Sequence, residues 1–130
     1  MKYRYCTSAV ASVALTAGKL GGAGLHGHDV RVKVCIDSDR IVDIEFLKEI
    51  TREAVGAYDH ASLDESIGPG ALIEDLLAEV QRRITASLEK KGIEARVASV
   101  EGSIPSGTII LLPEEEQDRQ GCPAECSPGL

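Results

Sequence analysis

Aromatic side chains are scarce in this sequence. Of 130 residues, one is Phe, three are Tyr and none is Trp. The hydrophobic core must therefore be built from Val, Ile, Leu and Ala, and the chain length suits one domain with one core. We expect that domain to span residues 1–112.

Positive charge is also in deficit, with a formal net charge of -7 and a pI near 4.9. Neutralising phosphates requires Lys and Arg, so the deficit argues against a nucleic-acid partner. No apolar run is long enough to span a bilayer, so we expect no membrane partner. Residues 8–16 faintly resemble a signal peptide, but they are few and are mainly Ala, Ser and Val. We therefore expect a cytoplasmic protein.

The cysteines lack the CxxC spacing of a metal knuckle, since they stand at positions 6, 35, 122 and 126. Free thiols in a reducing cytoplasm are the default expectation. Cys122 and Cys126 lie in residues 113–130, an acidic tail with Gly and Pro that we expect to be disordered. These two cysteines are either reactive thiols or ordinary parts of an unstructured tail.

Alternating apolar and polar residues predict a strand over residues 26–36, after a first strand over residues 3–16. The connection between them is rich in glycine, and residues 22–27 fit the pattern GxGxxG. A dinucleotide site needs a helix directly after that pattern, so we favour a flexible hairpin loop. Pairing the two strands brings Cys6 near Cys35, which we expect to be two buried thiols rather than a disulfide.

Two helices follow the hairpin and its polar turn at residues 37–40. Asp43 is the expected N-cap of a helix that ends near Tyr58, and residues 62–70 read as a loop. The second helix spans residues 71–90, with Gly92 as its left-handed stop. Strands over residues 93–100 and 107–112 complete the order. The sequence predicts an α+β fold, in which two helices cover one face of a four-stranded antiparallel sheet.

The three histidines of the chain all fall at the ends of predicted elements. His26 and His28 begin the second strand on the same face and are able to hold a transition metal, although a structural pair at a strand end is the alternative. Asp59 next to His60 suits proton transfer near neutral pH; the alternative is that His60 interacts with the dipole at the C-terminus of the first helix and Asp59 caps a turn. Glu101 stands at the end of the third strand, where a solvated side chain is the simpler interpretation.

With those residues placed, the chain resembles the 6-pyruvoyltetrahydropterin synthase family, which includes the 6-carboxytetrahydropterin synthases of queuosine biosynthesis. Residues 25–28 (Leu-His-Gly-His) look like the family's zinc segment, and residues 41–48 are similar to its first helix start. Residues 58–65 are similar to its Leu-Asp-His segment. Residues 100–103, with Gly107 and Ile109 beyond, look like the segment with its pterin-anchoring glutamate. The resemblance covers residues 3–112.

The resemblance implies the tunnelling fold, whose subunits join their sheets edge to edge into an oligomeric barrel with active sites between subunits. It implies a homo-oligomer, expected as a hexamer of two stacked trimers. His26 and His28 would be zinc ligands, Asp59 and His60 the catalytic pair, and Glu101 the anchor of a pterin, the small-molecule partner.

The chain departs from the family at two functional positions. The first of three zinc-binding histidines is expected near Ala11 or Ser12, and neither side chain replaces an imidazole. The catalytic cysteine stands four residues before the first histidine of the pair, where this chain has Gly22. We therefore expect zinc to be weakly bound or lost. The resemblance implies a carbon–oxygen lyase acting on dihydroneopterin triphosphate or a related pterin; the alternative is a non-catalytic, pterin-binding or structural homologue.

Overall fold

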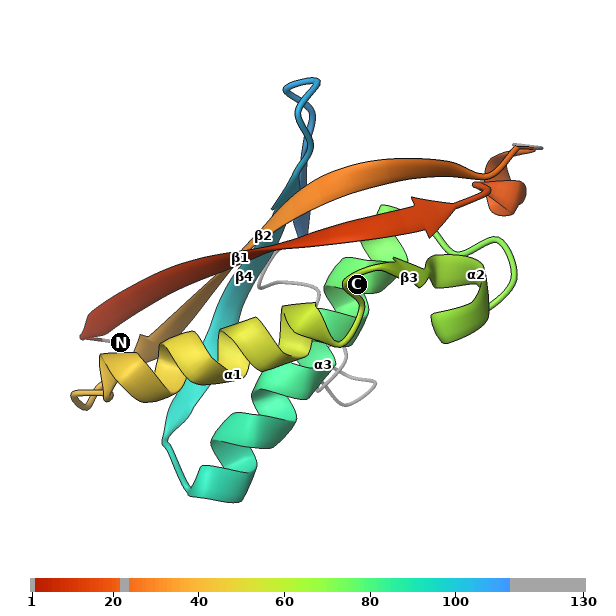
Figure 1. The fold of residues 1–130 in the computed structure, drawn as a ribbon. Coiled ribbons are helices and arrows are strands. Elements are labelled where there is room, and N and C mark those ends of the chain that lie inside the picture. Colours follow the sequence, from red (N-terminus) through yellow and green to blue (C-terminus); the bar gives the residue numbers. More distant parts are fainter. Residues whose placement is uncertain (1, 22–23, 113–130) are drawn as a thin grey trace, which may run out of the picture.

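The computed structural model describes residues 2–21 and 24–112, in which helices pack on one face of a mixed sheet (Figure 1). The sheet has five strands in the order β3-β1-β2-β4-β5. The α+β fold predicted from the sequence is confirmed. The elements are β1 (Tyr3–Leu15), η1 (Gly18–Leu20), β2 (His26–Ser38), α1 (Ile44–Gly56), β3 (Ala61–Ser62), α2 (Leu63–Ser66), α3 (Ile73–Lys91), β4 (Ala95–Ser103) and β5 (Ile109–Leu112).

The long hairpin of β1 and β2 has two unlike faces, because successive side chains of a strand alternate. Tyr5 and Thr7 of β1 point toward the helices: the Tyr5 hydroxyl accepts a hydrogen bond from the Val42 amide, and the Thr7 hydroxyl contacts that of Thr51 in α1. We call this side of the sheet the covered face. Its buried strand residues are Ala11, Val13, Leu15, Val30, Val32, Val34, Ile36, Val97 and Val100.

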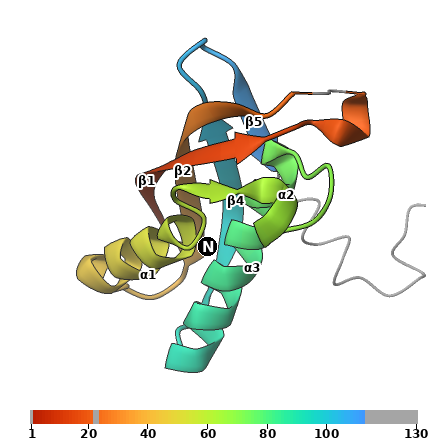
Figure 2. The same cartoon turned by 45° about the vertical axis from the view of Figure 1, so that its right-hand side comes forward.

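No helix of residues 2–21 and 24–112 lies on the opposite side of the same strands, and we call that side the uncovered face (Figure 2). It consists of alternate residues of the three longest strands. These are Arg4, Cys6, Ser8, Val10 and Ser12 of β1, Asp29, Arg31, Lys33, Cys35 and Asp37 of β2, and Ser99, Glu101 and Ser103 of β4.

The expected helix boundaries are confirmed to within a few residues. The Asp43 carboxylate accepts a hydrogen bond from the Glu45 amide and caps α1, as predicted. Gly92 ends α3 with φ of 76°, in the left-handed region that glycine adopts without strain. None of the helices in the described part of the chain is both long and apolar enough to cross a membrane.

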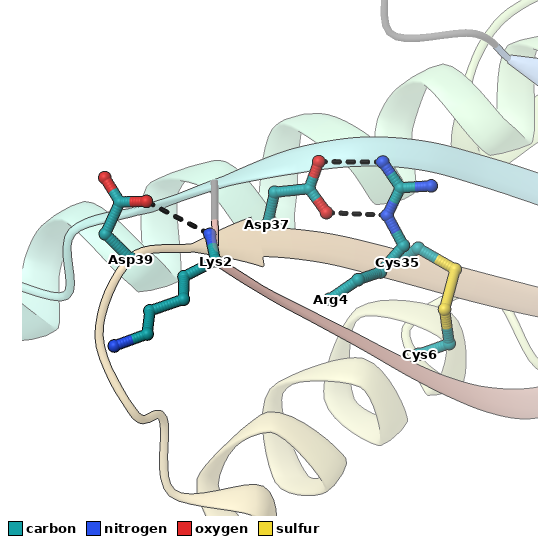
Figure 3. A network of polar contacts seen from close by, with 6 residues as sticks. All are labelled: Lys2, Arg4, Cys6, Cys35, Asp37 and Asp39. Carbon is teal, nitrogen blue, oxygen red and sulfur yellow. Dashed lines mark hydrogen bonds and ion pairs between the residues drawn. A yellow bond between two sulfur atoms is a disulfide. The ribbon is translucent and has the colours of Figure 1, made fainter.

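Two local expectations are wrong. The turn expected at residues 37–40 begins later, since Asp37 and Ser38 belong to β2 and are buried. Arg4 makes burial of Asp37 possible by donating two hydrogen bonds to it, of 2.6 and 2.8 Å (Figure 3). The loop expected at residues 62–70 contains α2 and follows β3, which pairs in parallel with the end of β1.

The expectation of two buried thiols is also wrong, because Cys6 and Cys35 form a disulfide (Figure 3). The register places them directly opposite each other, with Cα atoms 4.1 Å apart. Side chains at such a close cross-strand pair point to the same face and meet. Cys6 is exposed and Cys35 is 7% exposed, so only one sulfur lies in a buried residue. The tail at residues 113–130, with the disorder predicted for it, lies outside the described residues.

Candidate functional site

An open cavity of about 750 Å³ lies at one end of the sheet. The end of the β1–β2 hairpin, β3 and the connection from β4 to β5 surround it. The polar side chains among its lining residues belong to Ser12, His28, Asp29, His60, Ser62 and Ser106. Two of the five residues singled out in the sequence, His28 and His60, therefore line the same cavity.

The Asp59 carboxylate contacts the His60 ring at this cavity, with Nδ1 of His60 3.1 Å from Oδ2 of Asp59. Both residues are held by Ser12 of β1. The Ser12 amide donates to Oδ1 of Asp59 at 2.8 Å, and the Ser12 carbonyl accepts from the His60 amide at 2.6 Å. The backbone of His60 has φ of 60°, a left-handed conformation that costs a residue with a side chain about 1–3 kcal/mol.

This arrangement orients the His60 ring while leaving it open. The imidazole is 82% exposed, and its Nδ1 atom faces the carboxylate. The Ser12 amide, and then the neighbouring His60, hold the pKa of Asp59 below its usual range. Asp59 is therefore ionised at neutral pH, and it favours the tautomer of His60 that carries a proton on Nδ1. Nε2 is then the basic nitrogen.

A second carboxylate, which sequence reasoning missed, stands beside this pair. The Ser12 hydroxyl donates to Oδ1 of Asp29 at 2.6 Å. Ser12 thus connects Asp29 on β2 to the Asp59–His60 pair through one residue of β1. The two partners are 17 positions apart in sequence. Only the strand register brings Ser12 and Asp29 together, so no local sequence pattern predicts their hydrogen bond.

Asp64 is another site-forming residue that the sequence did not single out. Its carboxylate accepts hydrogen bonds from the amide and hydroxyl of Thr16 and from the Gly70 amide at 2.6 Å. The Gly70 amide makes the largest contribution to lowering the pKa of Asp64. These contacts tie the end of β1 to the segment before α3, and they fix β3 and α2 beside the cavity.

His26 and His28 lie side by side, with ring centroids 5.1 Å apart. Nδ1 of His26 is 3.0 Å from the Gly24 carbonyl oxygen. The residue directly opposite His28 on the same face is Val13, whereas Ser12 belongs to the uncovered face. The register thus places Val13, rather than Ser12, where a third ligand from β1 would stand.

The residues present do not fit a catalytic zinc ion. Such a site normally has three protein ligands and one open position. Within residues 2–21 and 24–112 no group of three His, Cys, Asp or Glu side chains is arranged to hold a metal. Gly22, which stands where the family's cysteine is expected, lies outside the described residues.

Glu101 lies elsewhere, on the uncovered face of β4, where it pairs with Lys33 of β2 and Leu111 of β5. It does not line the cavity. Its partner Lys33 is four residues along β2 from Asp29, which does line the cavity, and four extended residues span about 13 Å. Within one protomer, Glu101 therefore lies away from the cavity that His60 lines.

The fold itself has relatives among solved structures. No protein-family model matches the chain, and no curated protein does. The structure of Caenorhabditis elegans 6-pyruvoyl tetrahydropterin synthase superposes with a TM-score of 0.65 and 17% identity, covering 85% of this chain and 94% of that one. The chain has the fold of 6-pyruvoyl tetrahydropterin synthase.

Two further structures share this synthase fold. An uncharacterized protein from Wolinella succinogenes matches with a TM-score of 0.59 and 14% identity, covering 85% of this chain and 97% of that one. The 6-pyruvoyl tetrahydropterin synthase of Plasmodium falciparum matches with a TM-score of 0.54 and 15% identity, covering 85% of this chain and 98% of that one. At these identities the likeness extends to the fold, the tunnelling fold expected from the sequence.

Proposed function

We propose that the protein binds a pterin, with the heterocycle on Glu101 and the pterin's side chain at the Asp59–His60 pair. The observation that carries this proposal is the pair itself, held by Ser12 at the edge of a cavity in a synthase-like fold. A strained residue at such a place is typical of functional sites. The left-handed backbone of His60 therefore supports a role beyond packing.

The chemistry assigned to the pair is proton transfer. His60 takes a proton from the pterin side chain on Nε2, while Asp59 keeps the ring oriented and stabilises the imidazolium that forms. Asp29, whose Oδ1 atom is held by Ser12, accepts a hydrogen bond from a side-chain hydroxyl of the pterin. The reaction class that this arrangement serves is elimination from dihydroneopterin triphosphate: the C–H proton goes to Nε2, a carbon–carbon double bond forms, and the carbon–oxygen bond breaks with triphosphate as the leaving group. Its rate is low, because no thiol stands at Gly22.

Glu101 has the chemistry to recognise the ring. A carboxylate accepts two parallel hydrogen bonds from the exocyclic amine and an adjacent ring N–H of a pterin. Because one protomer keeps Glu101 away from the cavity, we propose that a second copy supplies the glutamate. The strands at the two sheet edges, β3 and β5, each have one side that pairs with no other strand of the described residues and is suited to such assembly. A hexamer of two stacked trimers is the proposed form.

Zinc is proposed to bind weakly, if at all, because His26 and His28 lack a third ligand among the described residues. Ligand binding by Glu101 and proton transfer by His60 do not depend on it.

Fluorescence titration with neopterin tests the binding proposal. The unaltered protein should quench the fluorescence of neopterin until binding saturates. Glu101→Gln should abolish neopterin binding, since the amide oxygen of Gln cannot accept hydrogen bonds from two donors in the way that a carboxylate does. Glu94→Gln removes the same charge from an exposed residue just before β4 and should bind like the unaltered protein. Equal binding by Glu101→Gln and Glu94→Gln would refute the assignment.

Turnover of dihydroneopterin triphosphate separates a lyase from a non-catalytic binding protein. His60→Asn keeps a residue that tolerates the left-handed backbone but removes the base. It should lower turnover by about 10²–10⁴-fold and leave neopterin affinity unchanged. Gly22→Cys should raise turnover if a thiol at that position is the missing group. Turnover that is unchanged in His60→Asn would assign the proton transfer to another residue.

A further inference from the structure

The two cysteines of the disulfide on the uncovered face differ in their access to solvent. Cys6 of β1 is exposed, whereas Cys35 of β2 is 7% exposed. The position of each residue in the sheet explains this difference. Cys35 lies between two strands, because β2 pairs with β1 on one side and with β4 on the other. Within the described residues, Cys6 has a neighbouring strand on one side only, since β3 pairs with β1 further along, at Val13 and Ala14.

This difference in access gives the two sulfurs different roles in thiol–disulfide exchange. Exchange begins when a thiolate attacks one sulfur of a disulfide, and the other sulfur departs as the leaving group. An incoming thiolate reaches the exposed Cys6, so Cys35 departs. Cys35 remains directly opposite Cys6, because the pairing of β1 with β2 extends from Tyr3 to Leu15. The Cys35 thiolate is therefore placed to attack a mixed disulfide on Cys6 and to close the original bond again.

A cation stands beside Cys6 on the same face. Lys33 of β2 is diagonal to Cys6, and such neighbours are about 7–8 Å apart, within reach of a long side chain. No carboxylate of residues 2–21 and 24–112 lies within ion-pair distance of the Lys33 ammonium. Asp37 is engaged by Arg4, and Glu101 is one strand further from Cys6, on β4. A small thiol that carries carboxylates is therefore attracted toward Cys6.

We propose that the Cys6–Cys35 bond is a redox-active site that exchanges with small anionic thiols of the glutathione class, with Cys6 as the attacked sulfur and Cys35 as the resolving thiol. The small thiolate bonds to the Cys6 sulfur, the Cys6–Cys35 bond breaks, and the Cys35 thiolate takes a proton from water. A second small thiolate attacks the sulfur of the first and releases Cys6 as a thiolate, which is protonated in turn. The protein gains two electrons, and the two small thiols that supply them leave as one disulfide. This activity goes beyond the proposed pterin site and does not depend on it.

Two matched variants of the full chain test which cysteine carries the mixed disulfide. Cys122 and Cys126 are replaced by Ser in both variants. Cys35→Ser and Cys6→Ser each remove the native disulfide, so any loss of stability is common to them. With oxidised glutathione, Cys35→Ser should form one mixed disulfide per chain, at Cys6. Cys6→Ser, whose one remaining thiol lies in a buried residue, should stay unmodified over the same interval, and equal modification of the two variants would overturn the assignment.

The native disulfide provides a second measurement, in protein with only Cys122 and Cys126 replaced by Ser. Reduced glutathione at mildly alkaline pH should open the bond. Quenching with iodoacetamide and peptide mapping should then find glutathione on Cys6 and the acetamide label on Cys35. Glutathione on Cys35 would contradict the proposal, and so would a disulfide that dithiothreitol opens but glutathione does not.

Lys33→Gln tests the preference for an anionic thiol. The rate of opening is measured with glutathione and with cysteamine, whose ammonium group cancels the charge of its thiolate. One unit charge at about 7 Å changes such a rate by about threefold in water at low salt, so Lys33→Gln should lower the ratio of the glutathione rate to the cysteamine rate by about that factor. Lys48→Gln, at an exposed residue of α1 on the covered side of the sheet, should leave the ratio unchanged. A ratio that is the same in Lys33→Gln and Lys48→Gln would refute this preference.

Discussion

The two faces of the β1–β2 hairpin differ in what they expose and in what they do. The covered face is closed by α1 and α3, and its strand residues from Val30 to Ile36 are fully buried aliphatic side chains. The alternate residues of the same strands form the uncovered face, which carries charged side chains, a disulfide and hydroxyl groups. The aliphatic core therefore lies on one face, whereas the charged and polar groups suited to recognition and chemistry stand on the other or at the end of the sheet.

Shortening a side chain on the covered face should have the largest effect. Ile36 is 0% exposed, and Ile36→Ala should lower the free energy of unfolding by about 2–5 kcal/mol, through lost burial and the cavity left behind. Urea denaturation measures the loss. Lys33→Ala, on the opposite face of the same strand, should change stability by less than about 0.5 kcal/mol. Similar losses in the two variants would abolish the distinction between the faces.

Opening the disulfide should have the next largest effect. It links β1 to β2 across 29 positions of sequence, and removing such a constraint from the unfolded chain costs about 2–4 kcal/mol of stability. A reductant should therefore lower the urea midpoint of the unaltered protein. The Cys6→Ser, Cys35→Ser double variant should have that lower midpoint already and should not respond. A reductant-insensitive midpoint in the unaltered protein would show that the bond is not part of the native state.

The register predicts that a histidine introduced into β1 strengthens zinc binding at position 13 but not at its neighbour, position 12, which lies on the opposite face. Val13→His places an imidazole opposite His28 and should strengthen zinc binding by about tenfold or more, since even outer-shell changes shift affinity by that factor. Ser12→His, on the other face, should not. Competition titration with a zinc-binding dye measures both. Tight stoichiometric zinc in the unaltered protein would reveal a ligand outside the described residues or on another subunit.

The smallest effect concerns the ion pair near the disulfide. Arg4 holds the pKa of Asp37 below its usual range, first through the side-chain hydrogen bonds. The stabilisation is present above the unfolded pKa, about 3.9, and is lost as pH falls through the lower folded value. Asp37→Asn should be less stable than the unaltered protein at pH 7, and the gap should narrow below about pH 4. Glu49→Gln, an exposed control on α1, should show no such gap.

Most of the fold follows from local signals. The period-two alternation of β2, the Asp43 cap and the Gly92 stop each specify their element by short-range physics, and each is found. β3 and α2 had no such signal. The two residues of β3 are strand only because the end of β1 is beside them, at Val13 and Ala14.

The site was harder to predict because its contacts depend on register and on chain segments far apart. Asp29 was passed over, since nothing near it in sequence indicates that Ser12 will hold it. That Val13 stands opposite His28 likewise depends on the register of β1 with β2, which the sequence does not specify to the residue. The proximity of Cys6 to Cys35 was anticipated but their bonding was not, because it depends on the exact register and on the 4.1 Å separation of their Cα atoms.

The claim that most needs testing is that one pterin site takes Glu101 from one copy and the Asp59–His60 pair from another. Size-exclusion chromatography with light scattering and pterin absorbance, over a dilution series that populates monomer, measures it directly. We predict that neopterin elutes with the oligomer at about one per chain, as one Glu101 per chain requires in a closed assembly, and is absent from the monomer. Neopterin bound to monomer at the same ratio would contradict the shared site.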